Sequence, residues 1–244
     1  MKAISTSVEC HGGMSASLQH LQVGYVGSVV AGPLDAVLPA GTLTCLLGRN
    51  GSGKSTLLRT LAGLQPALGG SVEFSRHSPA PQVGIVLTQR LDGVRLTVSE
   101  TVALGRMPYT GFMGRLNSHD REVVSWAMQQ TSTLPLADRQ VQTLSDGEWQ
   151  RVMLARVLAQ QTPIILADEV TAFLDYPSKR EVMRLLASVA HSLGLTVLLS
   201  THDVPLALDE ADRIWLLENG EGALSSLREG TPSQLSDIVA RSFI

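Results

Sequence analysis

The chain has 244 residues, of which 44% are hydrophobic and only 17% are charged, and its formal net charge is −3. This length fits one large domain, or one domain that carries an inserted subdomain. The acidic balance argues against a general nucleic-acid binder, which normally has a basic excess. Because charged residues are scarcer than usual, we expect partners to cover part of an apolar surface.

No membrane span or targeting segment stands out in the sequence. No apolar run approaches the roughly 18 residues that cross a bilayer, and the first residues, MKAISTSVECHGG, lack the apolar core of a signal peptide. The two cysteines, Cys10 and Cys45, have no CxxC spacing and fit a reducing compartment. We therefore expect a chain that stays in the cytoplasm, with Cys45 as a buried apolar filler.

The first 65 residues predict strands followed by one helix. SLQHLQVGY (17–25) and PLDAVLPAG (33–41) are short apolar runs broken by turn residues, as in a β-rich layer. TLTCLL (42–47) predicts a buried strand, and STLLRTLAGL (55–64) after it predicts a helix. The apolar face of this helix is formed by Leu57, Leu58, Leu61 and Leu64.

The middle of the chain is mostly helical. QVGIVL (82–87) predicts one more strand, and three helical stretches then follow between about 90 and 160. These stretches are VSETVALGR, HDREVVSWAMQQ and DGEWQRVMLARVLAQ. They interrupt the alternation of strands and helices and predict an inserted helical subdomain.

Alternation resumes after Pro163. IILA and LTVLLS predict buried strands on either side of a helix that ends at Gly194, and DRIWLLENGEGALSSL predicts a hairpin with its turn at Asn219-Gly220. The pattern favours an α/β fold with a mainly parallel sheet and an N-terminal antiparallel β layer. We expect a single domain over 1–244, with its core at about 1–89 and 161–244 and the helical subdomain at about 90–160.

A complete phosphate-binding motif lies between the buried strand and the helix that follows it. GRNGSGKS, from Gly48 to Ser55, matches GxxxxGK[ST], which chance produces in about one such chain per hundred. The glycines let backbone N–H groups surround phosphate oxygens at a helix N-terminus. Lys54 would reach the β- and γ-phosphates, and Ser55 would ligate Mg²⁺. The predicted nucleotide-binding residues here are Gly48, Asn50, Gly51, Ser52, Gly53, Lys54, Ser55 and Thr56; the alternative is a glycine-rich turn without a ligand.

Two acids and a histidine follow other buried strands. Asp168 and Glu169 come directly after IILA, and His202 follows LTVLLST, so all three would lie at the carboxyl edge of the sheet, where ligands bind in open α/β folds. Asp168 would hold Mg²⁺ through water, and Glu169 would orient or deprotonate the attacking water. The alternatives are that the acids only begin a loop and that His202 is structural.

The stretch LSDGEWQR (144–151) can be explained in two ways. Ser145 followed by Glu148 is a capping box, which by itself predicts only the start of a helix. A helix N-terminus with free N–H groups is also an anion site. The two explanations are compatible because both use the same backbone groups.

In their order and spacing these motifs resemble the nucleotide-binding subunits of ATP-binding-cassette transporters over nearly the whole chain. LSDGE resembles the family's LSGGQ signature, Tyr25 the aromatic residue that stacks on adenine, and Gln89 the glutamine that joins the metal to the membrane subunit. Ala172 to Asp175 resemble the loop that couples the two sites of a dimer, and His202 the histidine that senses the γ-phosphate. The resemblance adds six residues to the predicted nucleotide-binding set: Tyr25, Gln89, Ser145, Gly147, Glu148 and Asp175. The predicted metal ligands are Ser55, Gln89 and Asp168. The predicted catalytic residues are Glu169, His202 and Lys54.

The resemblance also implies an assembly. Two subunits would pair head to tail, with ATP between the phosphate loop of one and the signature helix of the other. Ser145 and Gly147 would then touch the γ-phosphate held by the partner. The homodimer would work with integral-membrane permease subunits at the cytoplasmic face of the membrane and indirectly with an extracytoplasmic substrate-binding protein.

Two features depart from the family pattern. Asp146 replaces the usual second glycine of the signature and Glu148 the usual glutamine, which adds negative charge near a phosphate site; both variants resemble those of metal-chelate importers. The stretch between Ser71 and Val83 is also shorter than usual, so that a family helix before the glutamine strand is expected to be missing.

The segment ALGRMPYTGFMGRL (103–116) resembles the matching region of importers for iron–siderophore complexes, haem and cobalamin. In the family it faces the membrane subunits, so it indicates a transporter class and does not select one cargo. The alternative is a helix end and loop in which Pro108 stops the helix and the glycines shape the turn.

Other functions fit less well. An ABC ATPase of another transporter class remains the alternative within the family, but fused membrane helices or a second cassette are absent from the sequence. A GTPase should show an NKxD motif, which does not occur, and a small-molecule kinase would not be expected to place LSDGE before the acidic strand. A non-catalytic binding module would be expected to lack Glu169 or His202.

Overall fold

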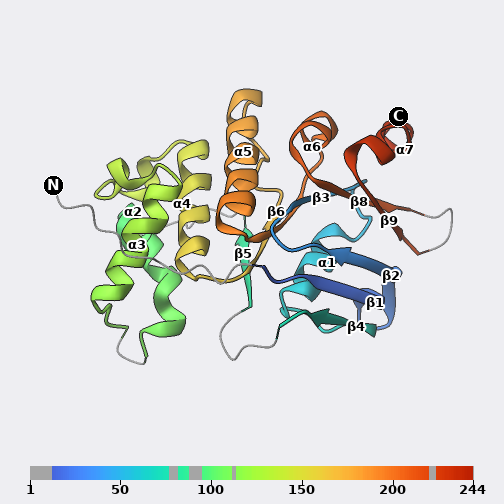
Figure 1. The fold of residues 1–244 in the computed structure, drawn as a ribbon, viewed down its shortest axis with the longest axis horizontal. Helices are drawn as coiled ribbons and strands as arrows, with labels where there is room; N and C mark the ends of the chain where they lie inside the picture. The colour runs from blue at the N-terminus through green and yellow to red at the C-terminus, as the bar shows by residue number, and fades with distance from the viewer. Residues whose placement is uncertain (1–12, 77–81, 88–94, 112–113, 220–223, 244) are drawn as a thin grey trace.

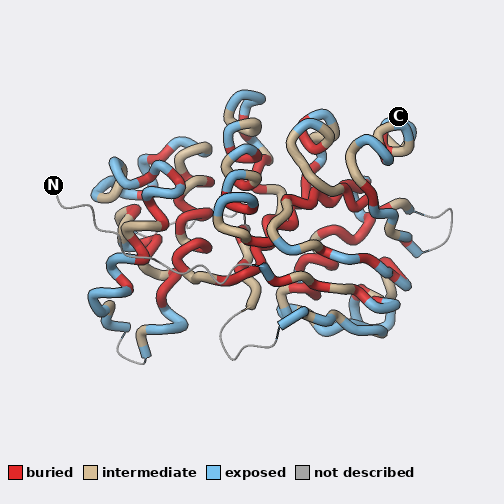
Figure 2. Tube along the Cα trace, viewed as in Figure 1, coloured by how far each residue is buried: buried red, intermediate tan, exposed pale blue. Residues whose placement is uncertain are grey.

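A computed structural model of the chain describes residues 13–76, 82–87, 95–111, 114–219 and 224–243. Two sheets with their helices form one part of the molecule, and a group of helices forms the other end (Figure 1). Buried residues concentrate along the strands and on the inner sides of the helices (Figure 2). No helix among the described residues is long and apolar enough to cross a membrane.

The larger sheet is mainly parallel, as predicted. Its strand order is β5-β6-β7-β3-β8-β9, and only β9 runs antiparallel to its neighbour. The strands are β3 (Leu43–Gly48), β5 (Val83–Leu87), β6 (Ile164–Asp168), β7 (Thr196–Ser200), β8 (Arg213–Glu218) and β9 (Ser226–Gly230). This order makes β3, β7 and β6 neighbours, so that the phosphate loop, the acidic strand end and the end of β7 share one edge.

The predicted N-terminal β layer is a separate antiparallel sheet of order β2-β1-β4. Its strands are β1 (Ala16–Tyr25), β2 (Ser28–Leu38) and β4 (Gly69–Phe74).

The larger, parallel sheet is buried on both faces. Successive residues of its strands point to opposite faces and pack into two different hydrophobic clusters. In β6, Ile164 and Leu166 pack towards the antiparallel layer and α1, whereas Ile165 and Ala167 pack towards the larger helical side. This period of two is expected for a sheet buried on both faces.

Helices follow the parallel strands. They are α1 (Lys54–Leu61), α5 (Tyr176–Leu193), α6 (Val204–Glu210) and, after β9, α7 (Pro232–Ser242). Helix α5 ends at Gly194, which has φ of +68°, as its position after the last apolar residue predicts. Cys45 is buried and free, and burial raises the pKa of its thiol, which confirms it as an apolar filler; Cys10 lies outside the described residues.

The helical group between the two halves of the core lies at one end of the molecule (Figure 1). It contains α2 (Val98–Ala103), α3 (Ser118–Gln130), α4 (Asp146–Ala159) and the short 3-10 helices η1 (Leu104–Tyr109), η2 (Leu134–Leu136) and η3 (Val141–Thr143). Helix α4 packs on α2 and α3 and also on α5 and β5 of the core. The signature stretch is therefore the start of the helix that joins this group to the sheet.

Several local predictions were wrong. The β8–β9 connection is not a two-residue turn at Asn219-Gly220, because the register pairs Glu218 with Ser226. Leu64 is 65% exposed rather than on the buried face of α1, since the helix ends at Leu61 and Gly63 adopts φ of +70°. Among the strands and α-helices of the described residues, β4, α6 and α7 went unpredicted.

Pro108 does not end a helix in the way the sequence suggested. Helix α2 already ends at Ala103, and Pro108 lies inside η1. Arg106 of the same segment forms a buried ion pair with Asp120 of α3: Arg106 Nε lies 3.0 Å from Asp120 Oδ1, and both side chains are at most 3% exposed. Arg106 also donates to Ala159 O at 2.8 Å and stacks on the ring of Tyr109 at 4.0 Å.

Arg106, a member of this ion pair, also binds the C-terminal end of α4. The last carbonyls of a helix lack partners within it, and here Arg106 and the hydroxyl of Tyr109 donate to the carbonyls of Ala159 and Gln160. Asp120 is also the acid of the capping box that begins α3. One buried pair thus holds three helical segments together.

We predict that Asp120→Ala lowers the free energy of unfolding by about 3–5 kcal/mol, because it leaves the buried guanidinium of Arg106 without its counter-charge. Urea unfolding followed by circular dichroism measures this change. The neighbouring Arg121→Ala, an exposed position on α3, is the control and should change stability by less than about 0.5 kcal/mol. Equal effects of the two substitutions would contradict the structural role of the pair.

Candidate functional site

The phosphate loop curls directly into the N-terminus of α1. Gly51 and Gly53 adopt φ of +81° and +100°, which glycine reaches without steric cost. Gly53 is also the N-cap of α1. A Cβ on Gly48 would lie 2.6 Å from Ser52 Oγ and 2.8 Å from Leu217 O. The glycines of the motif therefore allow the left-handed backbone at Gly51 and Gly53 and the close packing at Gly48. The loop has the form of an anion site at a helix N-terminus.

Lys54 lies inside this loop. Its side chain is buried, and its Nζ donates to Gly48 O at 2.8 Å and to Arg49 O at 3.1 Å. Burial lowers the pKa of Lys54, and the charges of Glu169 and Asp168 oppose that change. The ammonium is thus already directed into the loop and lies within the field of both acids.

Asp168 connects three elements at the edge of the sheet. Ser55 Oγ, at the start of α1, donates to Asp168 Oδ1 at 3.3 Å, and Ser200 Oγ, at the end of β7, donates to the same oxygen at 2.6 Å. The N–H of Glu169 in turn donates to Ser200 Oγ at 3.0 Å. Ser200 thereby orders both acids, although the sequence reasoning did not select it. Its position as the last residue of a buried strand, two residues before His202, was the available signal.

The donors near Asp168 fit magnesium. A hydroxyl and a carboxylate are hard oxygen ligands, and Mg²⁺ commonly takes one or two protein oxygens and keeps several waters. The described residues include no group of three or more His, Cys, Asp and Glu side chains placed to hold a metal. A metal here would therefore be held by the Ser55 and Asp168 oxygens rather than by a closed protein cage.

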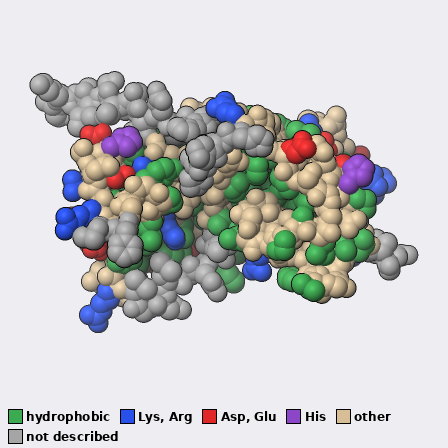
Figure 3. Space-filling view, turned by 90° about the horizontal axis from the view of Figure 1, so that it is seen from below, with side chains coloured by type: hydrophobic (Ala, Val, Ile, Leu, Met, Phe, Trp, Pro, Cys, Tyr) green, Lys and Arg blue, Asp and Glu red, His purple; other side chains and the backbone are tan. Residues whose placement is uncertain are grey.

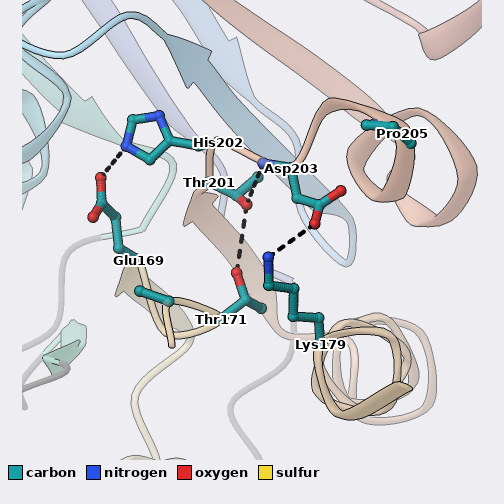
Figure 4. A pocket seen from close by; sticks show the side chains of 8 residues that line it. Glu169, Thr171, Lys179, Thr201, His202, Asp203 and Pro205 are labelled. Atoms are coloured by element: carbon teal, nitrogen blue, oxygen red, sulfur yellow. Dashed lines mark hydrogen bonds and ion pairs between the residues drawn. The ribbon is translucent and has the colours of Figure 1, made fainter. Parts of the chain in front are cut away.

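Glu169 and His202 meet above the sheet edge. His202 Nε2 lies 2.5 Å from Glu169 Oε1, and both side chains are partly exposed. Glu169 has φ of +51°, a conformation that a non-glycine residue adopts at a cost and that clusters at functional sites. The close-up in Figure 4 shows the two side chains pointing towards each other from the ends of β6 and β7.

Behind this pair, polar contacts hold the two loops together. The hydroxyls of Thr171 and Thr201 are 3.4 Å apart, and Lys179 of α5 pairs with Asp203 at 3.2 Å (Figure 4). These residues line a hollow of about 340 Å³ together with Glu169 and His202. Sequence reasoning missed Thr171, Thr201, Lys179 and Asp203, which become neighbours only when β6 and β7 pair.

A second hollow of about 410 Å³ lies in front of the phosphate loop. Tyr25, at the end of β1, is 54% exposed and lines this hollow with Glu169 and six predicted phosphate-loop residues. Those six are Asn50, Gly51, Gly53, Lys54, Ser55 and Thr56. The fold thus brings an aromatic side chain, the loop and an acid around one cleft.

The signature residues lie elsewhere. Ser145 caps α4, and the predicted capping box is present: the N–H of Glu148 donates to Ser145 Oγ at 3.3 Å, and the N–H of Ser145 donates to Glu148 Oε2 at 2.8 Å. That backbone hydrogen bond is the main cause of the lowered pKa of Glu148. A Cβ on Gly147 would lie 3.8 Å from Ser178 Oγ of α5. The N-termini of α4 and α5 are therefore neighbours.

Asp175 is the N-cap of α5, and its carboxylate accepts a hydrogen bond from the N–H of Ser178 at 3.0 Å. Hydrogen bonds from the side chain and then the backbone of Ser178 lower the pKa of Asp175. Just before it, Phe173 has φ of +65° and is 93% exposed. The predicted site residues thus form two groups: the loop, Tyr25, Asp168, Glu169 and His202 on one side, and Ser145, Gly147, Glu148 and Asp175 on the other. Gln89 lies outside the described residues.

The family model described as ABC transporter matches residues 32–172. The chain belongs to the ABC transporter family. The achromobactin transport ATP-binding protein CbrD of Dickeya dadantii is 36% identical over 90% of this chain and 83% of its own length. The hemin import ATP-binding protein HmuV of Nocardia farcinica is 41% identical over 78% of this chain and 68% of its own length.

Solved ABC structures share the fold. A chain of a metal-chelate type ABC transporter in an inward-facing conformation superimposes with a TM-score of 0.83 at 27% identity, covering 94% of this chain and 89% of that chain. The P-loop α/β fold with its antiparallel layer is confirmed. As an ATP-binding protein of this family, the ABC chain is an ATPase.

We predict that Ser200→Ala lowers kcat for ATP hydrolysis by about tenfold, because residues that orient metal ligands and catalytic groups typically contribute a factor of this order or more. The KM for ATP should change little. Steady-state phosphate release measures both constants. Ser192→Ala is the matched control, because the Ser192 hydroxyl donates to the carbonyl of Ser188 on the exposed face of α5. If Ser200→Ala has the same kcat as the unsubstituted protein, the bridge to Asp168 is dispensable.

Proposed function

We propose that this ABC ATPase binds Mg-ATP in the cleft between Tyr25 and the phosphate loop. The observation that carries the proposal is the convergence of Ser55, Asp168, Glu169 and His202 beside the loop. Tyr25 would stack on the adenine, Lys54 and the loop N–H groups would bind the phosphates, and Thr56 would support the α-phosphate. Ser55 and Asp168 would hold Mg²⁺, with Gln89 as the third predicted member of the set; bound there, the ion would neutralise phosphate charge.

Hydrolysis then requires a positioned water. Glu169 would accept a proton from the water as the water oxygen bonds to the γ-phosphorus and the bond from that phosphorus to the β,γ-bridging oxygen breaks, with ADP as the leaving group. His202, hydrogen-bonded to Glu169, would hold that carboxylate and contact the γ-phosphate. Lys54 would balance the charge on the phosphate oxygens. The strained conformation of Glu169 and the hydrogen bond that its N–H donates to Ser200 Oγ support this role because they limit where the carboxylate can lie.

We further propose a head-to-tail homodimer. In the ribbon, α4 and α1 lie in different parts of the molecule (Figure 1), so a signature helix that binds phosphate would reach the loop of a second copy. The exposed side chains of Phe173 and Tyr176, next to Asp175, are suited to such a contact. Exposed apolar groups of this size are typical of interaction sites.

The relatives and the segment 103–116 support a proposal for the transported cargo. We propose that the homodimer drives import of an iron chelate, a siderophore complex or haem, or of cobalamin, together with permease subunits at the cytoplasmic face of the membrane and with an extracytoplasmic binding protein. The helical group at about 90–160 would be the subdomain that meets the permease. Within the segment, Met107 and Tyr109 reach the surface, whereas Arg106 is buried. On the face seen in Figure 3, hydrophobic side chains lie between scattered charged ones.

We predict that Glu169→Gln abolishes most turnover, by about 100-fold or more, while ATP binding persists, because the water loses its proton acceptor but the phosphate contacts remain. In this variant, Mg-ATP should produce a dimer in size-exclusion chromatography. Lys54→Ala is the contrasting variant and should lose ATP affinity itself. Parent turnover in Glu169→Gln would refute the assignment of the base, and a monomer at high concentration with Mg-ATP would count against the dimer.

We predict that deletion of the gene impairs growth when iron is supplied only as a chelate or as haem, because the importer has lost its source of free energy. Uptake of labelled chelates, haem and cobalamin measures this. A parent copy should restore uptake and a Glu169→Gln copy should not. Normal uptake of every such cargo in a deletion strain without a redundant transporter would overturn the import proposal and leave the ATPase assignment intact.

A further inference from the structure

Glu148 stands where the family signature usually has a neutral glutamine, in the first turn of α4. The same turn carries Asp146, so two carboxylates lie beside the backbone groups that would receive a phosphate. Carboxylates are compatible with the helix dipole, but they repel an anionic ligand at close range. A phosphate-binding role for this turn therefore requires that the charge of Glu148 be offset.

Arg139 supplies that charge. Its Nη1 lies 2.9 Å from Glu148 Oε1, and its Nη2 donates to Thr143 O at 2.8 Å. The other carboxylate oxygen, Oε2, accepts from the N–H and the hydroxyl of Ser145. Both oxygens of Glu148 are thus occupied by donors from the chain.

The backbone of Arg139 is also held in place. Arg139 O accepts from the N–H of Val98 at 2.9 Å, and its N–H donates to Leu136 O at 2.9 Å. Gln140, the next residue, forms a β-bridge with Thr97. The main chain of Arg139 is therefore anchored beside the start of α2, and the guanidinium contacts to Glu148 and Thr143 place the side chain at the start of α4 before a ligand arrives.

We propose that Arg139 is a positioning residue that makes the acidic signature of this chain competent to bind the γ-phosphate of ATP held by a partner subunit. It balances the charge of Glu148 and keeps that carboxylate within the capping box. The net field at the N-terminus of α4 then remains attractive to an anion. This inference rests on the proposed head-to-tail dimer.

The test compares Arg139→Ala in two backgrounds. All proteins carry Glu169→Gln, so that ATP-driven dimerisation can be followed by size-exclusion chromatography without turnover. With Glu148 present, Arg139→Ala should raise the ATP concentration for half-maximal dimer about three- to tenfold, because like charges at a partly exposed interface repel although solvent screens them. With Glu148→Gln, the same substitution should change it by less than about twofold.

Two further measurements separate charge from folding. Arg139→Ala also removes the bond to Thr143 O, but a defect caused by that loss would be equal in both backgrounds. The penalty seen with Glu148 should shrink at about 0.5 M salt, where the Debye length is short. Arg121→Ala removes the same charge from the exposed face of α3 and should leave the midpoint unchanged.

The outcomes are distinct. Equal shifts in both backgrounds, or no shift with Glu148 present, would overturn the role of Arg139 while the dimer proposal stands. Failure of the Glu169→Gln protein itself to dimerise with Mg-ATP would instead refute the dimer and the inference that rests on it. A shift that appears with Glu148, disappears with Glu148→Gln and weakens in salt would establish the role.

Discussion

One carboxylate oxygen organises the site. Asp168 Oδ1 accepts from Ser55 at the start of α1 and from Ser200 at the end of β7, so the strand that carries the acids, the helix that follows the phosphate loop and the strand that leads to His202 meet at one atom. Ser200 extends the contact to the N–H of Glu169. Because the order β6-β7-β3 makes these strands neighbours, a change in strand order would separate every group of the site.

The second constraint is the placement of α4. Its C-terminal carbonyls are bound by Arg106 and Tyr109, and its N-terminus is closed by the capping box and by Arg139. Both ends of the helix are thus fixed by polar contacts, while its side packs on α2, α3 and α5. A rigid helix held in this way presents its first turn outward, where capping and anion binding use the same backbone groups.

The sequence predicted most of the fold because its local signals agreed. Short apolar runs bounded by a glycine or a proline located β3, β6 and β7, and longer stretches of helix-forming residues located α3, α4 and α5. The misses have local causes. Strand β4 (GGSVEF) and helix α6 (VPLALDE) are short, and short elements carry little periodicity. The asparagine-glycine pair at 219–220 suggested a tight turn, but the pairing of β8 with β9 begins at Ser226 and overrode it.

The sequence by itself determined the phosphate loop, the two acids at the end of β6 and the capping box at Ser145, because each is a run of adjacent residues whose backbone chemistry is local. Only the tertiary structure decided the contact of Glu169 with His202, the bridge through Ser200, the partner of Glu148 and the burial of Arg106. The first two of these join residues about 30 positions apart, and each of the four depends on which elements become neighbours. The physical reason is that neighbours in space are chosen by strand order and helix packing, which arise from burial of the whole core rather than from any single segment.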